Sequence, residues 1–218
     1  MSGIFYIMGK SATGKDKVYR QIKEDYPQLE PIVLYTTRPM RERESEGEEY
    51  HFIDEAALEA FKEQGKIIEQ RTYQTVHGPW HYATIDDGTV DVKTPGRFYV
   101  AIGTLEAYVQ TKNYFGENAL IPVYLYSSDE TRLLRSIRRE KKQANPNFKE
   151  VCRRFLADEK DFSEEKLTAA GVGPDGRFDK EEIGVCYPKI KEMIERVLRE
   201  EEACSRSIHL TIFSAGRR

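Results

Sequence analysis

Two shortages in the sequence limit the kinds of protein that it can encode: it has few cysteines and no long apolar run. Its 218 residues include three cysteines, Cys152, Cys186 and Cys204, and no two of them have the spacing of a zinc site. An odd number of widely spaced cysteines predicts reduced thiols in a cytoplasmic protein. No stretch has the character of a signal peptide or a membrane span, so we expect no membrane partner.

The sequence also lacks an excess of either charge. Its 34 lysines and arginines nearly balance 37 aspartates and glutamates, for a formal net charge of −3. This total gives no indication of a nucleic-acid partner, although the basic residues are clustered. We find no internal repeat, and the length suits one well-filled core with inserted subdomains. We expect a monomer or a homodimer.

One short segment near the start indicates chemistry. Residues 9–16 read GKSATGKD and match G-x-x-x-x-G-K-[ST] at every position but the last. An apolar run at 4–8 predicts a strand before the segment, and helical spacing predicts a helix over about 14–25 after it, which is the context of a phosphate-binding loop. Its backbone N–H groups and the helix N-terminus would attract an anion. We therefore expect ATP to bind Gly9, Lys10, Ser11, Ala12, Thr13, Gly14, Lys15 and Asp16, with Lys15 reaching the β- and γ-phosphates.

Asp16 stands where such loops normally place the serine or threonine that binds Mg²⁺. A carboxylate is a good ligand for a hard cation, but it also repels phosphate. Our hypothesis is that Asp16 holds the magnesium, directly or through water.

The rest of the chain alternates apolar strands with amphipathic helices, which predicts an α/β fold whose parallel sheet is covered by helices on both faces. Residues 33–95 break this pattern with short strands, a helix over 55–64 and a turn at Gly78-Pro79, and they predict a small mixed insertion. We expect further strands at 31–35, 97–102, 119–126 and 207–213, helices at 104–113, 129–143, 148–160 and 190–202, and an exposed loop over 171–184. The predicted division is a core (1–32, 96–128 and 161–218), an insertion (33–95) and a lid (129–160).

Two groups of arginines could bind phosphate. Arg38, Arg41 and Arg43 lie near Tyr50 and the hydroxyl of Thr36, a combination that suits a phosphate site. The alternative is a solvated charged loop, because glutamates interleave with these arginines. A phosphate-binding loop in the same chain favours the first interpretation.

The second group lies on two predicted helices. The first helix carries Arg132, Arg135, Arg138 and Arg139. Arg135 lies three residues after Arg132 and four before Arg139, so these three share a helix face, and Arg153 and Arg154 follow on the next helix. Phosphoryl transfer needs cations around the moving phosphate, and such a helix pair is typical of a closing lid. The alternative is an exposed helix pair neutralised by glutamates such as Glu150.

With the loop at 9–16, residues 36–52 resemble the guanylate kinase family, because they match T-T-R-x-x-R-x-x-E-x-x-G-x-x-Y-x-F throughout. The resemblance implies ATP-dependent phosphorylation of a nucleoside monophosphate with Mg²⁺, GMP being the favoured acceptor. It covers the first half of the chain well and the last 50 residues poorly. It implies GMP-binding residues at Thr36, Arg38, Arg41, Glu44, Tyr50, Glu69, Tyr82 and Thr84, with Glu44 bracing the arginines and Glu69 accepting N–H bonds from guanine. It implies catalytic residues at Lys15, Arg135, Arg139, Arg153 and Arg154.

Three positions depart from the family pattern. Asp16 is the first, Leu34 replaces a serine, and Ala101-Ile102-Gly103 replaces Asp-x-Asp, which removes one acidic group near the metal and one near the base. Two alternatives therefore remain open: a kinase of the same fold with another small phosphorylated acceptor, or a non-catalytic binding module. The retained Gly9, Gly14 and Lys15 argue against the module.

Overall fold

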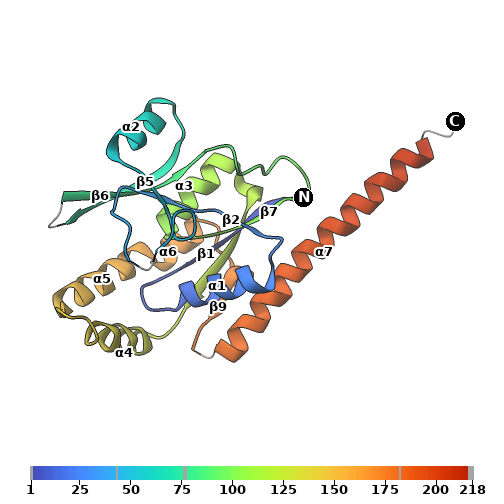
Figure 1. Cartoon of the computed structure of the whole chain (residues 1–218). Coiled ribbons are helices and arrows are strands. Elements are labelled where there is room, and N and C mark those ends of the chain that lie inside the picture. Colours follow the sequence, from blue (N-terminus) through green and yellow to red (C-terminus); the bar gives the residue numbers. More distant parts are fainter. Residues whose placement is uncertain (1, 43, 76–77, 182, 216–218) are drawn as a thin grey trace.

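The computed structural model describes residues 2–42, 44–75, 78–181 and 183–215, with side chains throughout except at 183 and 204–215. Two β-sheets organise the chain (Figure 1). The first, the core sheet, contains in spatial order β2 (Glu30–Pro31), β7 (Phe98–Gly103), β1 (Gly3–Gly9), β8 (Leu120–Tyr126) and β9 (Arg177–Asp179). All of its pairings are parallel. β1 is the central strand and is buried along its whole length.

Alternate residues of β1 point into two separate hydrophobic cores, as the two-residue period of a strand requires. Ile4 and Tyr6 pack with helices α3 and α6, whereas Phe5 and Ile7 pack with α1 and α7 on the opposite face. These helices are α1 (Lys15–Asp25), α3 (Leu105–Phe115), α6 (Glu164–Ala169) and α7 (Ile183–Ala215). The prediction of a parallel sheet covered on both faces is confirmed.

The second sheet, here called the insertion sheet, is mixed. Its strands in spatial order are β4 (His51–Phe52), β3 (Tyr35–Thr36), β6 (Gly78–Ile85) and β5 (Ile67–Thr75). Helix α2 (Glu55–Glu63), capped by Asp54, covers one face through Leu58, which packs with Ala83 and Ile85. The other face carries polar side chains, because Glu69 pairs with Thr84 and Arg71 with Tyr82 across the β5–β6 ladder.

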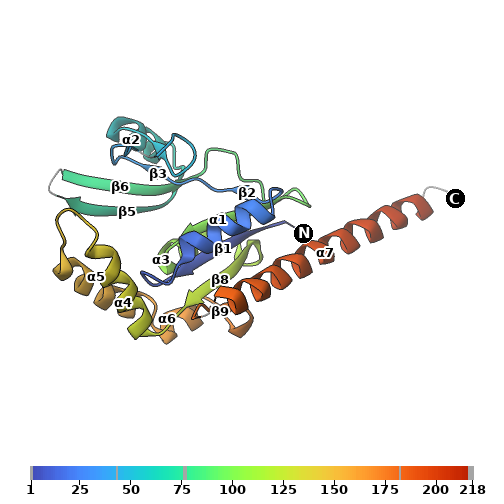
Figure 2. The same cartoon turned by 60° about the horizontal axis from the view of Figure 1, so that its bottom comes forward.

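Two helices project from the core on the same side as the β5–β6 hairpin (Figure 2). They are α4 (Asp129–Glu140) and α5 (Phe148–Asp161). Short 3₁₀ turns, η1 (Glu117–Ala119) and η2 (Pro174–Gly176), complete the elements. The C-terminal part of α7 extends in the opposite direction (Figures 1 and 2). No helix in the described ranges combines the length and apolar character needed to cross a bilayer.

Four sequence-based expectations about elements are corrected by the structure. The single strand expected at 31–35 is two short strands, β2 in the core sheet and β3 in the insertion sheet. The loop expected at 171–184 contains η2 and β9, because Phe178 is buried against the core. The strand expected at 207–213 is helical and belongs to α7.

The fourth correction concerns the turn expected at Gly78-Pro79. Both residues lie in β6, where they pair with Thr75 and Gln74 of β5. The turn is therefore not at Gly78-Pro79, and residues 76–77, which join β5 to β6, lie outside the described ranges.

Candidate functional site

The phosphate loop lies at the carboxyl end of β1, directly before α1. Gly9 allows close packing, because a Cβ at this position would approach the carbonyl oxygen of Leu125 to 2.5 Å. Gly14, the N-cap of α1, has a φ of 88°, and Ala12 has a φ of 63°, which is uncommon for a residue with a Cβ. Lys15 and Asp16 open the helix, and the Asp16 side chain is exposed. The positive φ angles at Ala12 and Gly14 turn the chain sharply between β1 and α1, as a phosphate-binding loop requires.

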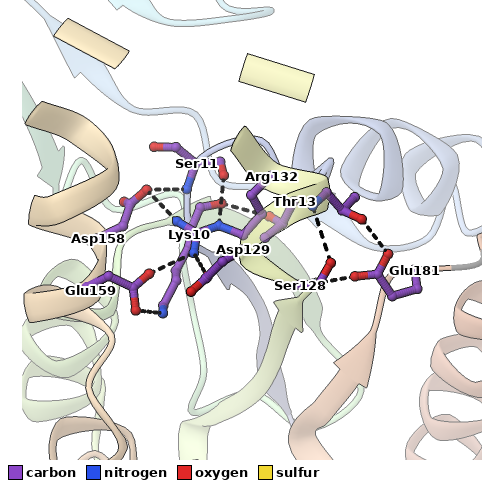
Figure 3. Close-up of polar contacts among 10 residues, drawn as sticks. Lys10, Ser11, Thr13, Ser128, Asp129, Arg132, Asp158, Glu159 and Glu181 are labelled. Atoms are coloured by element: carbon purple, nitrogen blue, oxygen red, sulfur yellow. Dashed lines mark hydrogen bonds and ion pairs between the residues drawn. The ribbon is translucent and has the colours of Figure 1, made fainter. Parts of the chain in front are cut away.

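A polar network joins this loop to α4 and α5 (Figure 3). Lys10 forms an ion pair of 2.6 Å with Glu159, and the backbone N–H of Ser11 donates to the Asp158 carboxylate at 2.7 Å. The hydrogen bonds from Lys10 and Arg132 hold the pKa of Glu159 below its usual range, although burial opposes this shift. Lys10 and Ser11, which follow the first glycine of the loop, are thus both bound to carboxylates of α5.

Arg132 is at the centre of this network, and sequence reasoning grouped it with the other arginines of this helix but assigned it no role in the site. Its side chain is 1% exposed and donates to the Ser11 carbonyl at 3.3 Å, to Asp129 at 2.9 Å and to Glu159 at 2.8 Å. A further bond of 3.2 Å reaches Asp158. In the sequence, Arg132 was one arginine among several, and only the fold shows that it faces the loop.

The four arginines predicted from α4 and α5 occupy different surroundings. Arg135 donates to the Ser127 hydroxyl at 3.4 Å, and Arg139 and Arg154 both line a small cavity together with Ser11 and Asp158. Arg153 and Arg154 also pair with Glu150 of their own helix, and their side chains are 62% and 56% exposed. These contacts, chiefly that of Arg153, lower the pKa of Glu150 to about 2. The structure thus places Arg139 and Arg154 at a cavity beside the loop, whereas Arg153 is paired on the surface of α5.

Arg38 anchors the predicted phosphate site of the acceptor. Its side chain is 3% exposed and forms two bonds of 2.9 Å to Glu44, while the rings of Tyr50 and Phe52 lie 5.4 and 5.6 Å from its Cζ. The Arg41 backbone N–H also donates to Glu44 at 2.9 Å. The Arg38 contact holds the pKa of Glu44 below its usual range. The Nε atom of Arg38 is buried and has no partner among the described residues.

Aromatic and hydroxyl side chains complete this site. The Tyr50 and Tyr82 rings lie 5.5 Å apart and meet edge to face. Thr36 donates to the His81 carbonyl at 2.8 Å and accepts from the Arg38 backbone N–H at 3.2 Å. The structure thus brings Thr36, Arg38, Glu44, Tyr50 and Tyr82 together on the insertion sheet and its preceding loop, and Arg43 lies outside the described ranges.

Glu69, the predicted carboxylate for the base, is 2% exposed on β5. Its Oε1 accepts from Thr84 at 2.9 Å, as expected of two residues predicted to share one pocket. Sequence reasoning did not include Arg71, which donates through Nε to Oε2 at 3.0 Å and through Nη2 to Oε1 at 3.2 Å. Glu69 and Arg71 are two residues apart on a strand, so they share a face, and this period could have indicated the pair.

At the end of β7, where the family pattern places acidic residues, the space of one side chain is filled by a tyrosine. A Cβ at Gly103 would collide with the hydroxyl of Tyr6, which therefore occupies the space of a side chain at that position. Burial, with a smaller contribution from the charge of Glu69, raises the pKa of Tyr6 and keeps its hydroxyl protonated. A neutral donor thus stands beside the Glu69–Arg71 pair in place of a carboxylate.

Lys180 is a second buried cation beside the phosphate loop. Its side chain is 5% exposed, and its Cε lies 3.8 Å from the position that a Cβ on Gly14 would take. Its backbone N–H donates to the Tyr126 carbonyl at 2.7 Å, which places it at the carboxyl edge of the core sheet. Burial lowers the pKa of Lys180, and the neighbouring Lys17 and Arg135 act in the same direction.

A cavity of about 980 Å³ adjoins the loop on the side of α6 and η2. Its lining includes Lys10, Thr13, Arg132 and Glu159 but neither Lys15 nor any predicted acceptor residue. Lys10 and Thr13 are loop residues predicted to bind ATP, but the other lining residues belong to no predicted site, and we assign the cavity no substrate of its own.

The parallel sheet, the phosphate loop at its carboxyl edge and the inserted mixed sheet define a P-loop NTPase fold. The profile of the guanylate kinase family matches residues 3–166, three quarters of the chain, so the chain belongs to this family. A guanylate kinase structure from Anaplasma phagocytophilum superposes with a TM-score of 0.58 over 90% of this chain and 86% of that chain. At 14% identity, this likeness concerns the fold alone.

Curated relatives match shorter parts. A guanylate kinase of Chromobacterium violaceum is 30% identical over 92 residues, which are 40% of this chain and 44% of that protein. One from Chlorobium luteolum is 29% identical over 111 residues, covering 51% and 54% respectively. The chain thus spans about half the length of these relatives.

Proposed function

We propose that the protein catalyses ATP-dependent phosphorylation of a nucleoside monophosphate, with GMP as the favoured acceptor and GDP and ADP as products. The observation that carries the proposal is Arg38, a buried guanidinium fixed by Glu44 whose Nε lacks a partner among the described residues. Buried hydrogen-bond donors normally have a partner, so this Nε–H indicates that a ligand completes the site. The phosphate of the acceptor could accept its hydrogen bond.

The roles follow from the placement of the groups. The loop N–H groups and Lys15 would hold the β- and γ-phosphates of ATP, while Arg38, Arg41, Tyr50 and Tyr82 would hold the acceptor phosphate. An acceptor oxygen forms the new P–O bond in line as the bond from the γ-phosphorus to the β,γ-bridging oxygen breaks. Cationic side chains from α4 and α5, with Arg135 and Arg139 nearer the loop, would neutralise the moving phosphoryl group.

Asp16 would supply one oxygen ligand to Mg²⁺. Its exposed carboxylate follows Lys15 directly in the first turn of α1, and Mg²⁺ in nucleotide sites is commonly held by one or two carboxylates with phosphates and water. The ion, when bound, neutralises phosphate charge. The division into core, insertion and lid, the catalytic roles of Arg153 and Arg154, and a monomeric or homodimeric state stay predictions.

The test is an ADP-release assay with ATP and magnesium that offers GMP, dGMP, AMP, CMP, UMP or no acceptor. We expect turnover that depends on GMP and falls by about 10²- to 10³-fold in Lys15→Ala, because the charge on the transferred group loses its cation. Lys17→Ala, an exposed lysine on the same helix, serves as the matched control. ATP binding without turnover of any acceptor would mean that the acceptor belongs to another class.

A further inference from the structure

The Glu69–Arg71 pair determines how many hydrogen bonds the base pocket can still accept. A carboxylate offers about four lone-pair directions. Arg71 and Thr84 together occupy both of those on Oε1, and Arg71 Nε occupies one on Oε2, at distances of 2.9 to 3.2 Å. One acceptor direction therefore remains, on Oε2.

A guanine base would need more than this. Its Watson–Crick edge carries two adjacent donor groups, the N1–H and the exocyclic 2-amino group, beside the O6 acceptor. A carboxylate without other partners would accept both donors. Here the second bond would require Glu69 to leave Arg71, whose side chain is 16% exposed, or Thr84, which is 4% exposed. Separating a buried ion pair leaves charges without partners and is strongly unfavourable.

No second carboxylate stands at the end of β7 to replace the occupied directions of Glu69. Gly103 and Ala101 carry no carboxylate, and the Tyr6 hydroxyl beside Gly103 stays protonated and interacts with Thr111, so it is a neutral and weaker acceptor than a carboxylate. Arg71, by contrast, adds donors, because no hydrogen bond in the described ranges engages its Nη1. The pocket thus presents one acceptor and additional donors, which matches a keto oxygen beside a single ring N–H.

We propose that Arg71 is a specificity-determining residue that removes discrimination for the 2-amino group of the acceptor base. The pocket would then accept 6-oxopurine monophosphates as a class, and inosine monophosphate, which differs from GMP only by lacking that amino group, would be phosphorylated comparably. Arg71 acts through Glu69, so it is a positioning residue. This inference rests on the proposed function and refines the acceptor that it names.

The test compares kcat/KM for GMP and inosine monophosphate in the wild-type protein and in Arg71→Ala. In the wild type we expect the two values to agree within about tenfold. In Arg71→Ala, Glu69 regains its acceptors, and the GMP preference should rise about 10- to 100-fold, the value of one hydrogen bond to a charged group. General damage to the fold would lower both values together and leave their ratio unchanged.

Two further variants test whether a change in the ratio comes from the contact between Arg71 and Glu69. Arg71→Lys keeps the charge but can reach only one carboxylate oxygen well, so its GMP preference should rise by a smaller factor. Gln70→Ala removes an exposed side chain from the opposite face of β5 and should leave the ratio unchanged. A wild-type GMP preference above about 100-fold, or an Arg71→Ala variant that keeps both kcat/KM values and their ratio at the wild-type level, would overturn the inference while GMP kinase activity stands.

Failure of the proposed function gives a different result. If neither nucleotide is phosphorylated, calorimetric titration of the same variants with GMP and inosine monophosphate measures the ratio as affinities. Comparable binding in the wild type and a GMP preference in Arg71→Ala would support the inference without the activity. Absence of binding by both would overturn it together with the proposed acceptor.

Discussion

Asp16 changes the electrostatics of the phosphate loop. A serine or threonine would give a neutral metal ligand, whereas this carboxylate attracts Mg²⁺ and repels the phosphates when no metal is present. Its position in the first turn of α1 adds the attraction of the helix N-terminus for negative charge. If Asp16 holds the ion as proposed, it would couple nucleotide binding to the metal more tightly than a hydroxyl would.

Replacement of Asp16 should separate these two effects. In Asp16→Asn the Mg²⁺ concentration for half-maximal rate should rise about tenfold or more, because a charged ligand is lost. Binding of metal-free ATP should become tighter, because the repulsion is lost as well. The magnesium dependence is measured by titrating the metal and following the rate. The affinity for metal-free ATP is measured by fluorescence titration in the presence of a chelator. Glu24→Gln, on the same helix, is the control for both. An unchanged magnesium dependence in Asp16→Asn and in Asp16→Ser would show that another group holds the ion.

Sequence reasoning succeeded where a residue's role depends on its neighbours in the chain. The loop around Lys15 is local, and its spacing predicted the strand and helix on either side of it, whereas the Arg38–Glu44 contact was implied by the resemblance to the guanylate kinase family. The contacts of Arg71 and Arg132 were missed for different reasons. Arg71 lies two residues after Glu69 on one strand, so the sequence could have shown that their side chains share a face. Arg132 and Ser11 are 121 residues apart, and only the fold brings them together.

At the scale of elements, α4 and α5 are held to the phosphate loop by charge more than by apolar packing. α5 has no fully buried residue, and the only buried residue of α4 is Arg132. Asp158, Glu159 and the ring of Phe155 surround its guanidinium, with Phe155 4.8 Å from Cζ. The position of the helix pair thus depends on one arginine, a contrast with the core helices α1 and α3.

Arg132→Ala should detach this helix pair from the loop. It removes the cation that Asp129, Asp158 and Glu159 share near Ser11, and removal of one partner from a buried ion network costs about 3–5 kcal/mol. Denaturant unfolding should show the loss, and hydrogen exchange should show faster exchange of α5 amides. Arg138→Ala, an exposed arginine of the same helix, should change stability by less than about 0.5 kcal/mol. Equal stability of the two variants would mean that the network does not hold the helices.

The whole molecule is asymmetric, because α7 is part of the core at one end and projects from it at the other (Figures 1 and 2). Cys186, Ile190, Met193 and Ile194 are buried, with Val197 and Leu198 packed beside them. From the sequence we expected a helix ending near 202 and then a strand, since residues 207–213 are apolar and include β-branched types. Short apolar runs do not distinguish a strand from a continued helix, and the chain here continues α7.

This asymmetry predicts that the two halves of α7 contribute unequally to stability. Burial of four apolar side chains is worth about 6–12 kcal/mol, comparable with the whole stability of a typical domain. Ile190→Ala should therefore cost about 2–5 kcal/mol, whereas Val185→Ala, 51% exposed on the same helix, should cost little.

Deletion of residues 204–218 keeps every one of the buried α7 side chains named above. It should lower the melting temperature by less than about 2 °C and should leave ADP release unchanged, since every residue named in the candidate site precedes the deleted segment. Calorimetry of the deletion beside Ile190→Ala makes the comparison within one helix. A loss as large as that of Ile190→Ala would mean that the projecting half packs against this chain or a second copy, and sedimentation of the two proteins at several concentrations would distinguish these cases.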